Sequence, residues 1–298
     1  MNYALCCISN QLAREGYKFQ KMTYTRFKSL DKNEAIKILS ERILNNFVVT
    51  HKVIQHCVKM GLEGYRLSSD LTPVLNHPEV NIRLQDLPNY DTIYSVIKET
   101  ISYYKRTGIR ITAHPSEFIS LTSKNPEVIK NSVRDLVNHG EIFDLYELPR
   151  SYEACLNIHC RQEGDPVEVS KSFLFNYNKL PETVKSRLTL EVNDNKNGIW
   201  TVKNLCKYFY NEAGIPITFD TLHHSHCNSG ESDEQAFNLA YKTWPVIPVF
   251  HYSEGINGTR NHAETALGLP NGYYKPVLWD IELKGKDDAI ALMLNKHK

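Results

Sequence analysis

Residues 91–114, DTIYSVIKETISYYKRTGIRITAH, contain one full helix-and-strand unit and decide the fold class. Asp91 is a residue type that caps helix N-termini, and Gly108 is the type that most often ends a helix. The β-branched stretch 109–113 then predicts a buried strand, and His114 follows it directly. The apolar residues between the two helix signals have the spacing of one helix face: Ile93, Val96, Ile97 and Ile101.

The same unit recurs along the chain. The capping-box pattern 31–34 predicts a helix that ends near Met60, and further helices are expected to start at Asn125, at Thr201 and at Ser232. Strands are expected at residues 3–8, 64–68, 109–113, 154–158, 188–190, 215–219, 246–250 and 277–281. Eight strands that alternate with helices favour an α/β fold over residues 1–298, a single closed (β/α)8 TIM barrel rather than an open doubly wound sheet.

Composition excludes several classes of protein. The 298 residues are 41% hydrophobic and 23% charged, as in globular proteins, and no apolar run is long enough to span a membrane. The start lacks the basic region of a secretory signal. The seven cysteines contain no C-x-x-C pair, which argues against a disulfide framework and for a reducing compartment. We therefore expect a soluble cytoplasmic protein, and a net charge of +1 means that any nucleic-acid surface is a local patch.

Side chains that can bind a metal ion directly follow six of the eight expected strands. They are His114, His159, Glu191, Asp220, His251 and Glu282. Strand ends converge on the catalytic face of a barrel, which His223 and His262 can also reach. Imidazole and carboxylate together suit Mn, Zn, Fe or Co better than Mg or Ca. The set exceeds the needs of one ion, so we expect two or three ions and the chemistry of phosphoester hydrolysis.

Each of these residues also has a purely structural interpretation. A single histidine is more often hydrogen-bonded than metal-bound, Asp220 could be a helix N-cap, and Glu282 could pair with Lys284. His224 and His226 remain open between support of the metal ligands and phosphate contacts. The remaining histidines, expected on helices or outer loops, are interpreted as structural: His51, His56, His77, His139 and His297.

Short motifs in matching order and spacing resemble the UV-damage endonuclease family, relatives of endonuclease IV. They include residues 22–27 (MTYTRF), 65–69 (YRLSS), 77–80 (HPEV), 114–118 (HPSEF), 157–159 (NIH), 188–191 (LTLE), 219–224 (FDTLHH), 251–253 (HYS), 261–263 (NHA) and 281–282 (IE). The resemblance implies a TIM barrel with a metal cluster, usually of Mn²⁺, and the mixed nitrogen and oxygen ligands leave Zn²⁺ or Co²⁺ as alternatives. It also implies incision of duplex DNA immediately 5′ of ultraviolet photoproducts, leaving a 3′-hydroxyl and a 5′-phosphate.

The resemblance assigns roles to individual residues. It implies the same eight ligands as the strand ends do: His114, His159, Glu191, Asp220, His223, His251, His262 and Glu282. Of these, Glu191, Asp220, His251 and Glu282 are expected to be catalytic. Expected contacts with DNA or the lesion are Ser68, Ser69, Arg66, Glu117, Phe118, His224, Arg260 and Lys284.

The chain departs from the family pattern at three positions. Glu117 stands where the family has glutamine, so it is protonated, faces bases rather than phosphates, or changes the choice of lesion. Cys7 replaces a family aromatic residue on the first strand. Val249 replaces a lysine, sometimes carboxylated, two residues before His251. Valine offers no oxygen, which predicts that one metal position is weaker.

The leading hypothesis is a metal-dependent endonuclease that acts on damaged double-stranded DNA as a monomer. Deformability would guide recognition, since photodimers stack poorly and cost less to extrude. The alternative is a metal-dependent sugar isomerase or epimerase on the same scaffold, and a third possibility is a DNA-binding barrel without activity. The intact ligand set argues against the third possibility. By the resemblance, Glu117 and Phe118 wedge into the duplex opposite the lesion, and these two residues argue against the second possibility. The basic candidates Arg66, Arg260 and Lys284 also argue against it.

Overall fold

Eight parallel strands form one sheet in the computed structural model, which describes residues 2–196 and 198–296. The strands are β1 (Asn2–Cys6), β2 (Gly64–Leu67), β3 (Arg110–Ala113), β4 (Leu156–His159), β5 (Leu188–Glu191), β6 (Ile217–Thr218), β7 (Val249–Tyr252) and β8 (Leu278–Ile281). Their order in the sheet is β6-β5-β4-β3-β2-β1-β8-β7. All eight expected strands are therefore confirmed, with bounds shifted by a few residues.

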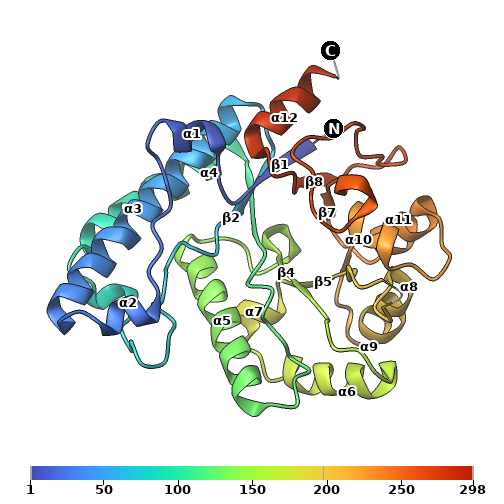
Figure 1. Ribbon diagram of the computed structural model, residues 1–298, viewed down its shortest axis with the longest axis horizontal. Coiled ribbons are helices and arrows are strands. Elements are labelled where there is room, and N and C mark those ends of the chain that lie inside the picture. Colours follow the sequence, from blue (N-terminus) through green and yellow to red (C-terminus); the bar gives the residue numbers. More distant parts are fainter. Residues whose placement is uncertain (1, 197, 297–298) are drawn as a thin grey trace.

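The two outer strands of this sheet meet and nearly close it into a barrel. Asp220, just after β6, forms a parallel bridge with His251 on β7. The His251 amide donates to the Phe219 carbonyl over 2.9 Å. Figure 1 shows the strands in the middle of the molecule with helices around them. This arrangement confirms the TIM barrel.

Helices follow the strands around the barrel. They are α1 (Asn10–Arg14), α2 (Tyr24–Lys28), α3 (Lys32–Lys59), α4 (Tyr90–Thr107), α5 (Pro126–Leu145), α6 (Pro166–Tyr177), α7 (Glu182–Lys185), α8 (Val202–Leu205), α9 (Asn211–Ala213), α10 (Thr221–His226), α11 (Asp233–Tyr241) and α12 (Lys286–Asn295). Short 3₁₀ turns lie at Leu84–Asp86, Tyr152–Ala154 and Ile256–Gly258, and a π-helical turn at Cys206–Tyr210 joins α8 to α9. No helix among the described residues is both long and apolar enough to cross a bilayer.

Most of the expected helix ends are confirmed by capping contacts. The Asp31 carboxylate accepts from the amides of the first turn of α3, and Ser232 forms a capping box with Gln235 at the start of α11. Gly108 ends α4 in the left-handed conformation, at φ 74°.

The expected start of α4 at Asp91 is wrong. The N-cap is Asn89, because the amide of Ile93 already donates to the Asn89 carbonyl over 3.0 Å. A side-chain contact fixes this earlier start, since the Ser40 hydroxyl accepts from the Asn89 amide over 3.0 Å. Asp91 lies in the first turn instead, where its charge favours the helix dipole.

The strands have different surroundings on their two faces. Outward side chains such as Tyr65, Ile111 and Leu190 are buried against the helices and make the apolar core. Inward side chains are mostly polar although they are equally buried: Thr112, Asn157, Thr189, Thr218 and Asp280 lie inside the barrel with Val249. This polar interior supports the side chains at the carboxyl ends of the strands.

Candidate metal centre

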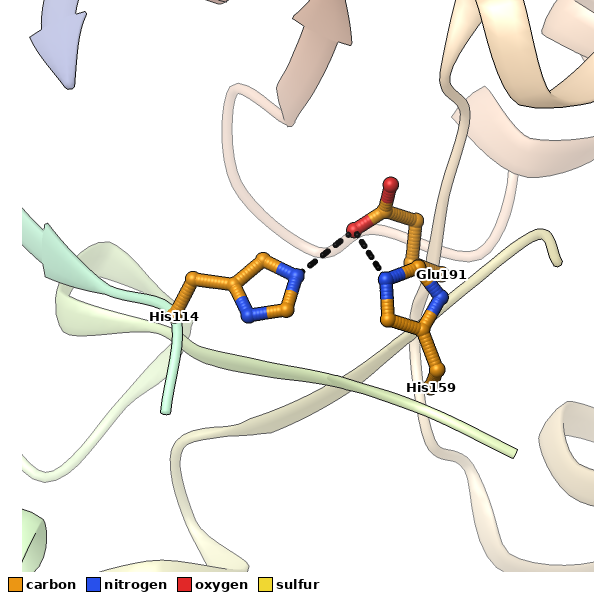
Figure 2. Close-up of side chains that lie close together, drawn as sticks. All are labelled: His114, His159 and Glu191. Atoms are coloured by element: carbon orange, nitrogen blue, oxygen red, sulfur yellow. Dashed lines mark hydrogen bonds and ion pairs between the residues drawn. The ribbon is translucent and has the colours of Figure 1, made fainter. Parts of the chain in front are cut away.

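Glu191, the last residue of β5, is the centre of the site. It is 1% exposed, and its carboxylate faces four imidazoles, which come from the loop after β3, from β4, from α10 and from β7. Oε2 lies 3.1 Å from His114 Nε2, 3.6 Å from His159 Nε2 and 3.1 Å from His251 Nδ1, while Oε1 lies 2.9 Å from His223 Nδ1. Figure 2 shows His114 and His159 directed at the same oxygen of Glu191. The convergence predicted from strand ends is thus present in the structure.

Within residues 2–196 and 198–296, three overlapping groups of side chains each bring together ligand atoms within 4.8 Å of one another. They are His114, His159 and Glu191; Glu191, Asp220 and His223; and Asp220, His251 and Glu282. Glu191 belongs to the first two groups and Asp220 to the last two. Because a carboxylate has two oxygens, each of these acids could serve two neighbouring ions. Seven of the eight expected ligands are in these groups.

Asp220 combines two of the roles considered from the sequence. It is the N-cap of α10, since Oδ1 accepts from the His223 amide over 2.6 Å. Its other oxygen, Oδ2, is buried and has no hydrogen-bond partner in the part of the chain that the structure describes. The cap orients the side chain and leaves one oxygen available for a cation.

Charge coupling inside the site is strong. Burial favours the neutral form of Glu191, but His251, His159 and His223 outweigh it and hold the pKa of Glu191 well below its usual range. Burial opposes the charge of His251, yet Glu191 and Glu282 raise its pKa to about 9. Burial lowers the pKa of His159 to about 3. Burial raises the pKa of Asp220, with Glu191 and Glu282 adding to the effect.

The donor set fits a divalent cation. A neutral imidazole has one N–H, yet His114 faces an oxygen acceptor at both nitrogens, with Nδ1 3.0 Å from the Pro115 carbonyl and Nε2 3.1 Å from Glu191. Among the described residues, Asp220 Oδ2 and Glu191 Oε1 are buried and have no hydrogen-bond partner, although His223 Nδ1 lies 2.9 Å from Glu191 Oε1. Such oxygens are costly unless a proton or a cation satisfies them. Nitrogen and oxygen donors in this mixture suit Mn²⁺, Zn²⁺ or Co²⁺.

His262, the eighth expected ligand, lies at the edge of the site. Its Nε2 is 3.9 Å from Glu282 Oε2, and its side chain is 28% exposed. It is carried by a hairpin that begins at Gly255, which pairs with His262 in an antiparallel bridge. The structure therefore brings His262 to the mouth but not into the three groups.

Five of the eight expected DNA contacts are exposed. They are Ser69, Glu117, Phe118, Arg260 and Lys284. Phe118 is 82% exposed in the loop after β3, close in sequence to His114. Glu117 Oε2 lies 3.6 Å from a guanidinium nitrogen of Arg161, a residue that the sequence reasoning did not select.

The other three expected DNA contacts are buried. Arg66 lies inside the barrel, where Nη1 pairs with Glu282 Oε1 and lies 3.4 Å from Asp280 Oδ2. Ser68 is 6% exposed and accepts from the Asp70 amide. His224 is 1% exposed, and its Nε2 lies 3.2 Å from the Glu231 carbonyl. These placements do not present the three side chains to a DNA backbone.

Among the histidines interpreted as structural, the described ones have local partners. His51 Nδ1 is 3.0 Å from the Thr100 hydroxyl, His56 pairs with Asp287, and His139 lies 3.7 Å from Asp135. His77 stacks on Tyr24. His297 lies outside the described residues.

Two buried polar residues below the site were not selected from the sequence as functional. Asn157 Nδ2 donates to Glu191 Oε2, and Asp280 lies 3.8 Å from His251 Nε2. Each stands two residues before an expected ligand, His159 and Glu282. Because strand side chains alternate, that spacing alone could have indicated that they point inward, below the ligands.

Comparison with known proteins agrees with this geometry. A family model described as UV-endonuclease UvdE matches residues 1–298. The chain belongs to the UvdE family. UvdE membership makes it a DNA repair nuclease. A UV DNA damage endonuclease of Nostoc sp. is 31% identical over 283 residues, which cover 92% of this chain and 84% of that protein. The one from Deinococcus radiodurans is 27% identical over 292 residues, 93% of this chain and 90% of the relative.

Solved structures include a UvdE protein and more distant barrels. The crystal structure of SacUVDE matches with a TM-score of 0.82 and 25% identity, covering 100% of this chain and 98% of that one. A D-tagatose 3-epimerase-like protein matches with a TM-score of 0.59 and 12% identity, covering 100% and 96% of the two chains. At that identity the second match shows only a shared fold.

Proposed function

We propose that this UvdE protein is a metal-dependent endonuclease that incises duplex DNA immediately 5′ of ultraviolet photoproducts and leaves a 3′-hydroxyl and a 5′-phosphate. It acts as a monomer built on a single barrel of residues 1–298. The observation that carries the proposal is the buried carboxylate of Glu191, faced by imidazoles of His114, His159, His223 and His251.

The residues of the three ligand groups would hold two or three divalent ions, and Mn²⁺ is the metal that we propose first. Divalent ions at such a site supply a hydroxide nucleophile at neutral pH and stabilise the leaving oxygen of a phosphodiester. His114 and His159 would hold an ion together with Glu191, and Glu191 and Asp220 could each serve two ions because each belongs to two of the groups. The buried setting excludes bulk water and strengthens every charge interaction within it.

The DNA side of the proposal is based on exposed residues of the same face. Phe118 is a large apolar side chain that is mostly solvent-exposed, as a residue that wedges between base steps must be. Photodimers stack poorly, so a wedge at such a site separates bases at lower cost than in undamaged duplex. Arg260 and Lys284 are exposed at the loops after β7 and β8 and are candidates for phosphate contacts.

A sugar isomerase would use a similar metal set but would not need an exposed wedge. Small-molecule sites enclose their ligands, and an exposed phenyl ring at the mouth gives no advantage there. Phe118 therefore favours a duplex over a sugar as the substrate.

The test is nicking of supercoiled plasmid, irradiated or not, by metal-depleted protein to which Mn²⁺ is added back. We expect nicking of irradiated plasmid only, and only with the metal. A duplex oligonucleotide with one photodimer then locates the cut, and primer extension by a polymerase checks for the 3′-hydroxyl. Equal cutting of undamaged plasmid, or cutting 3′ of the lesion, would contradict the proposal. Light scattering of the purified protein tests the monomer.

A further inference from the structure

Asp280 is a buried carboxylate that belongs to none of the three ligand groups. It lies on β8, where it is the register partner of His251 on β7, and it is 1% exposed. Two residues later, Glu282 belongs to one of the groups. Asp280 therefore lies one layer below the candidate metal centre, inside the barrel.

The two oxygens of Asp280 have different surroundings. Oδ1 accepts from the Cys6 thiol over 3.0 Å. Oδ2 has no hydrogen bond to any described residue, and it lies 3.4 Å from Arg66 Nη1 and 3.8 Å from His251 Nε2. Arg66 thus lies against the oxygen that would otherwise be free to bind an ion, while the same oxygen faces the imidazole of His251.

The imidazole of His251 lies between Asp280 on one side and Glu191 and Glu282 on the other. Its Nδ1 lies 3.1 Å from Glu191 Oε2 and 3.2 Å from Glu282 Oε1, so this nitrogen faces two carboxylates of the ligand groups. Its Nε2 faces Asp280 on the other side. Histidines that bind metals usually donate their second N–H to such a carboxylate, which fixes the tautomer and raises the basicity of the ligand nitrogen.

We propose that Asp280 is a positioning residue, which holds the proton of His251 on Nε2 and so keeps Nδ1 as the ligand atom. Arg66 completes the arrangement because it pairs with both Asp280 and Glu282 and offsets their charge. The inference rests on the proposed metal-dependent function, but it concerns metal binding alone and is tested without DNA.

The first experiment uses the unsubstituted protein, labelled with ¹⁵N-histidine and loaded with Zn²⁺, which is diamagnetic. A His251→Gln spectrum serves only to assign the signals of His251. We expect the His251 ring to carry its proton on Nε2, with Nδ1 unprotonated. A proton on Nδ1, with Nε2 as the ligand nitrogen, would overturn the proposal.

The second experiment measures Mn²⁺ binding to Asp280→Asn by electron paramagnetic resonance of free Mn²⁺. We expect the dissociation constant to rise roughly 10- to 100-fold, the usual cost of losing such a partner. The matched control is Asp287→Asn, since Asp287 is also fully buried and pairs with a histidine, His56, but lies outside the three groups.

We expect Asp287→Asn to lower the melting temperature and leave Mn²⁺ affinity unchanged. An Asp280→Asn protein that binds Mn²⁺ like the unsubstituted protein, whatever its melting temperature, would show that Asp280 is structural only. If this variant does not fold, the tautomer measurement on the unsubstituted protein decides. Failure of the nuclease proposal would appear instead as absent nicking with metal affinity intact.

Discussion

Arg66 on β2 and Glu282 just after β8 form an ion pair inside the barrel, although 216 residues separate them in the chain. Their side chains are 11% and 12% exposed. The guanidinium contacts Glu282 Oε1, the same oxygen that lies 3.2 Å from His251 Nδ1. A cation from the protein itself therefore already compensates one acid of the Asp220, His251 and Glu282 group.

We predict that an ion in this group is held more weakly than the ions near Glu191. Repulsion from Arg66 opposes it, and the buried Val249 below His251 offers no further oxygen. Metal analysis after gel filtration should give about two Mn²⁺ per chain, with the third seen only on titration. Three ions retained per chain in the absence of DNA would refute this prediction.

Glu191→Gln should abolish nicking of irradiated plasmid, with a loss on the order of a hundredfold or more. The amide keeps the shape of the side chain but removes the charge that four imidazoles surround. Circular dichroism should show an intact fold. The assignment fails if the variant nicks at the unsubstituted rate.

Phe118→Ala should weaken binding to irradiated duplex roughly tenfold, because one stacked aromatic contributes about 1–3 kcal/mol. Its melting temperature should not change, since the ring is 82% exposed. Phe175→Ala is the control: Phe175 is a 63% exposed phenylalanine on α6. Fluorescence anisotropy measures both. A lower melting temperature with unchanged DNA affinity would mean that Phe118 is structural.

Gly255→Ala should disturb the hairpin that carries Arg260 and His262. A Cβ at position 255 would lie 2.2 Å from the Thr259 carbonyl oxygen, so the backbone of the hairpin must move. Displacement of Arg260 and His262 should lower the nicking rate by on the order of ten- to a hundredfold. Gly268→Ala, in the same long loop, is the control, because its Cβ would meet nothing closer than 3.5 Å. Equal nicking rates for the two variants would contradict the prediction.

The metal-free protein should lose stability in acid, where the stabilising charge of Asp287 is neutralised. Burial favours its neutral form, but hydrogen bonds from His56, Ser9 and two backbone amides outweigh burial and lower the pKa of Asp287 to about 2, from an ordinary 3.8. A carboxyl group whose pKa is lower in the folded than in the unfolded protein stabilises the fold at pH values above its unfolded pKa. This stabilisation, here about 2 kcal/mol, is lost as the pH falls through the folded pKa.

Urea unfolding at about pH 7 and pH 3 with a chelator present measures this contribution. Asp287→Asn should be less stable than the unsubstituted protein at neutral pH, and the gap should narrow at pH 3. A gap that stays constant between the two pH values would show that the carboxylate charge does not matter.

The sequence predicted the barrel well because its signals are local. The β-branched stretch 109–113 predicts a strand, and Asp31 and Gly108 mark helix ends, through contacts with neighbours within a few residues. The start of α4 was missed because the Ser40 hydroxyl, 49 residues away, accepts from the Asn89 amide. The helix propensities of the residues near Asn89 give no information about a contact so far away in the chain.

The convergence of the candidate ligands was predictable for a different reason. Parallel strands end on one face, so residues such as His114 and Glu191 could be brought together without knowing any distance. Arg66 could not be placed in the same way. We expected a DNA contact there, but Arg66 points into the barrel and pairs with Asp280 and Glu282. Glu282 is 216 residues away along the chain, so no local signal predicts this pairing.

A bound metal ion would also stabilise the contact between β6 and β7, the two edges of the sheet. In the part of the chain that the structure describes, the bridge between Asp220 and His251 joins these strands, and both residues belong to one ligand group. An ion held there would fasten the two edges of the sheet, and its loss would let the ring open, with faster deuterium uptake and proteolysis along β6 and β7. Metal supply in the cell would then set how long each copy of the protein survives as well as how fast it works.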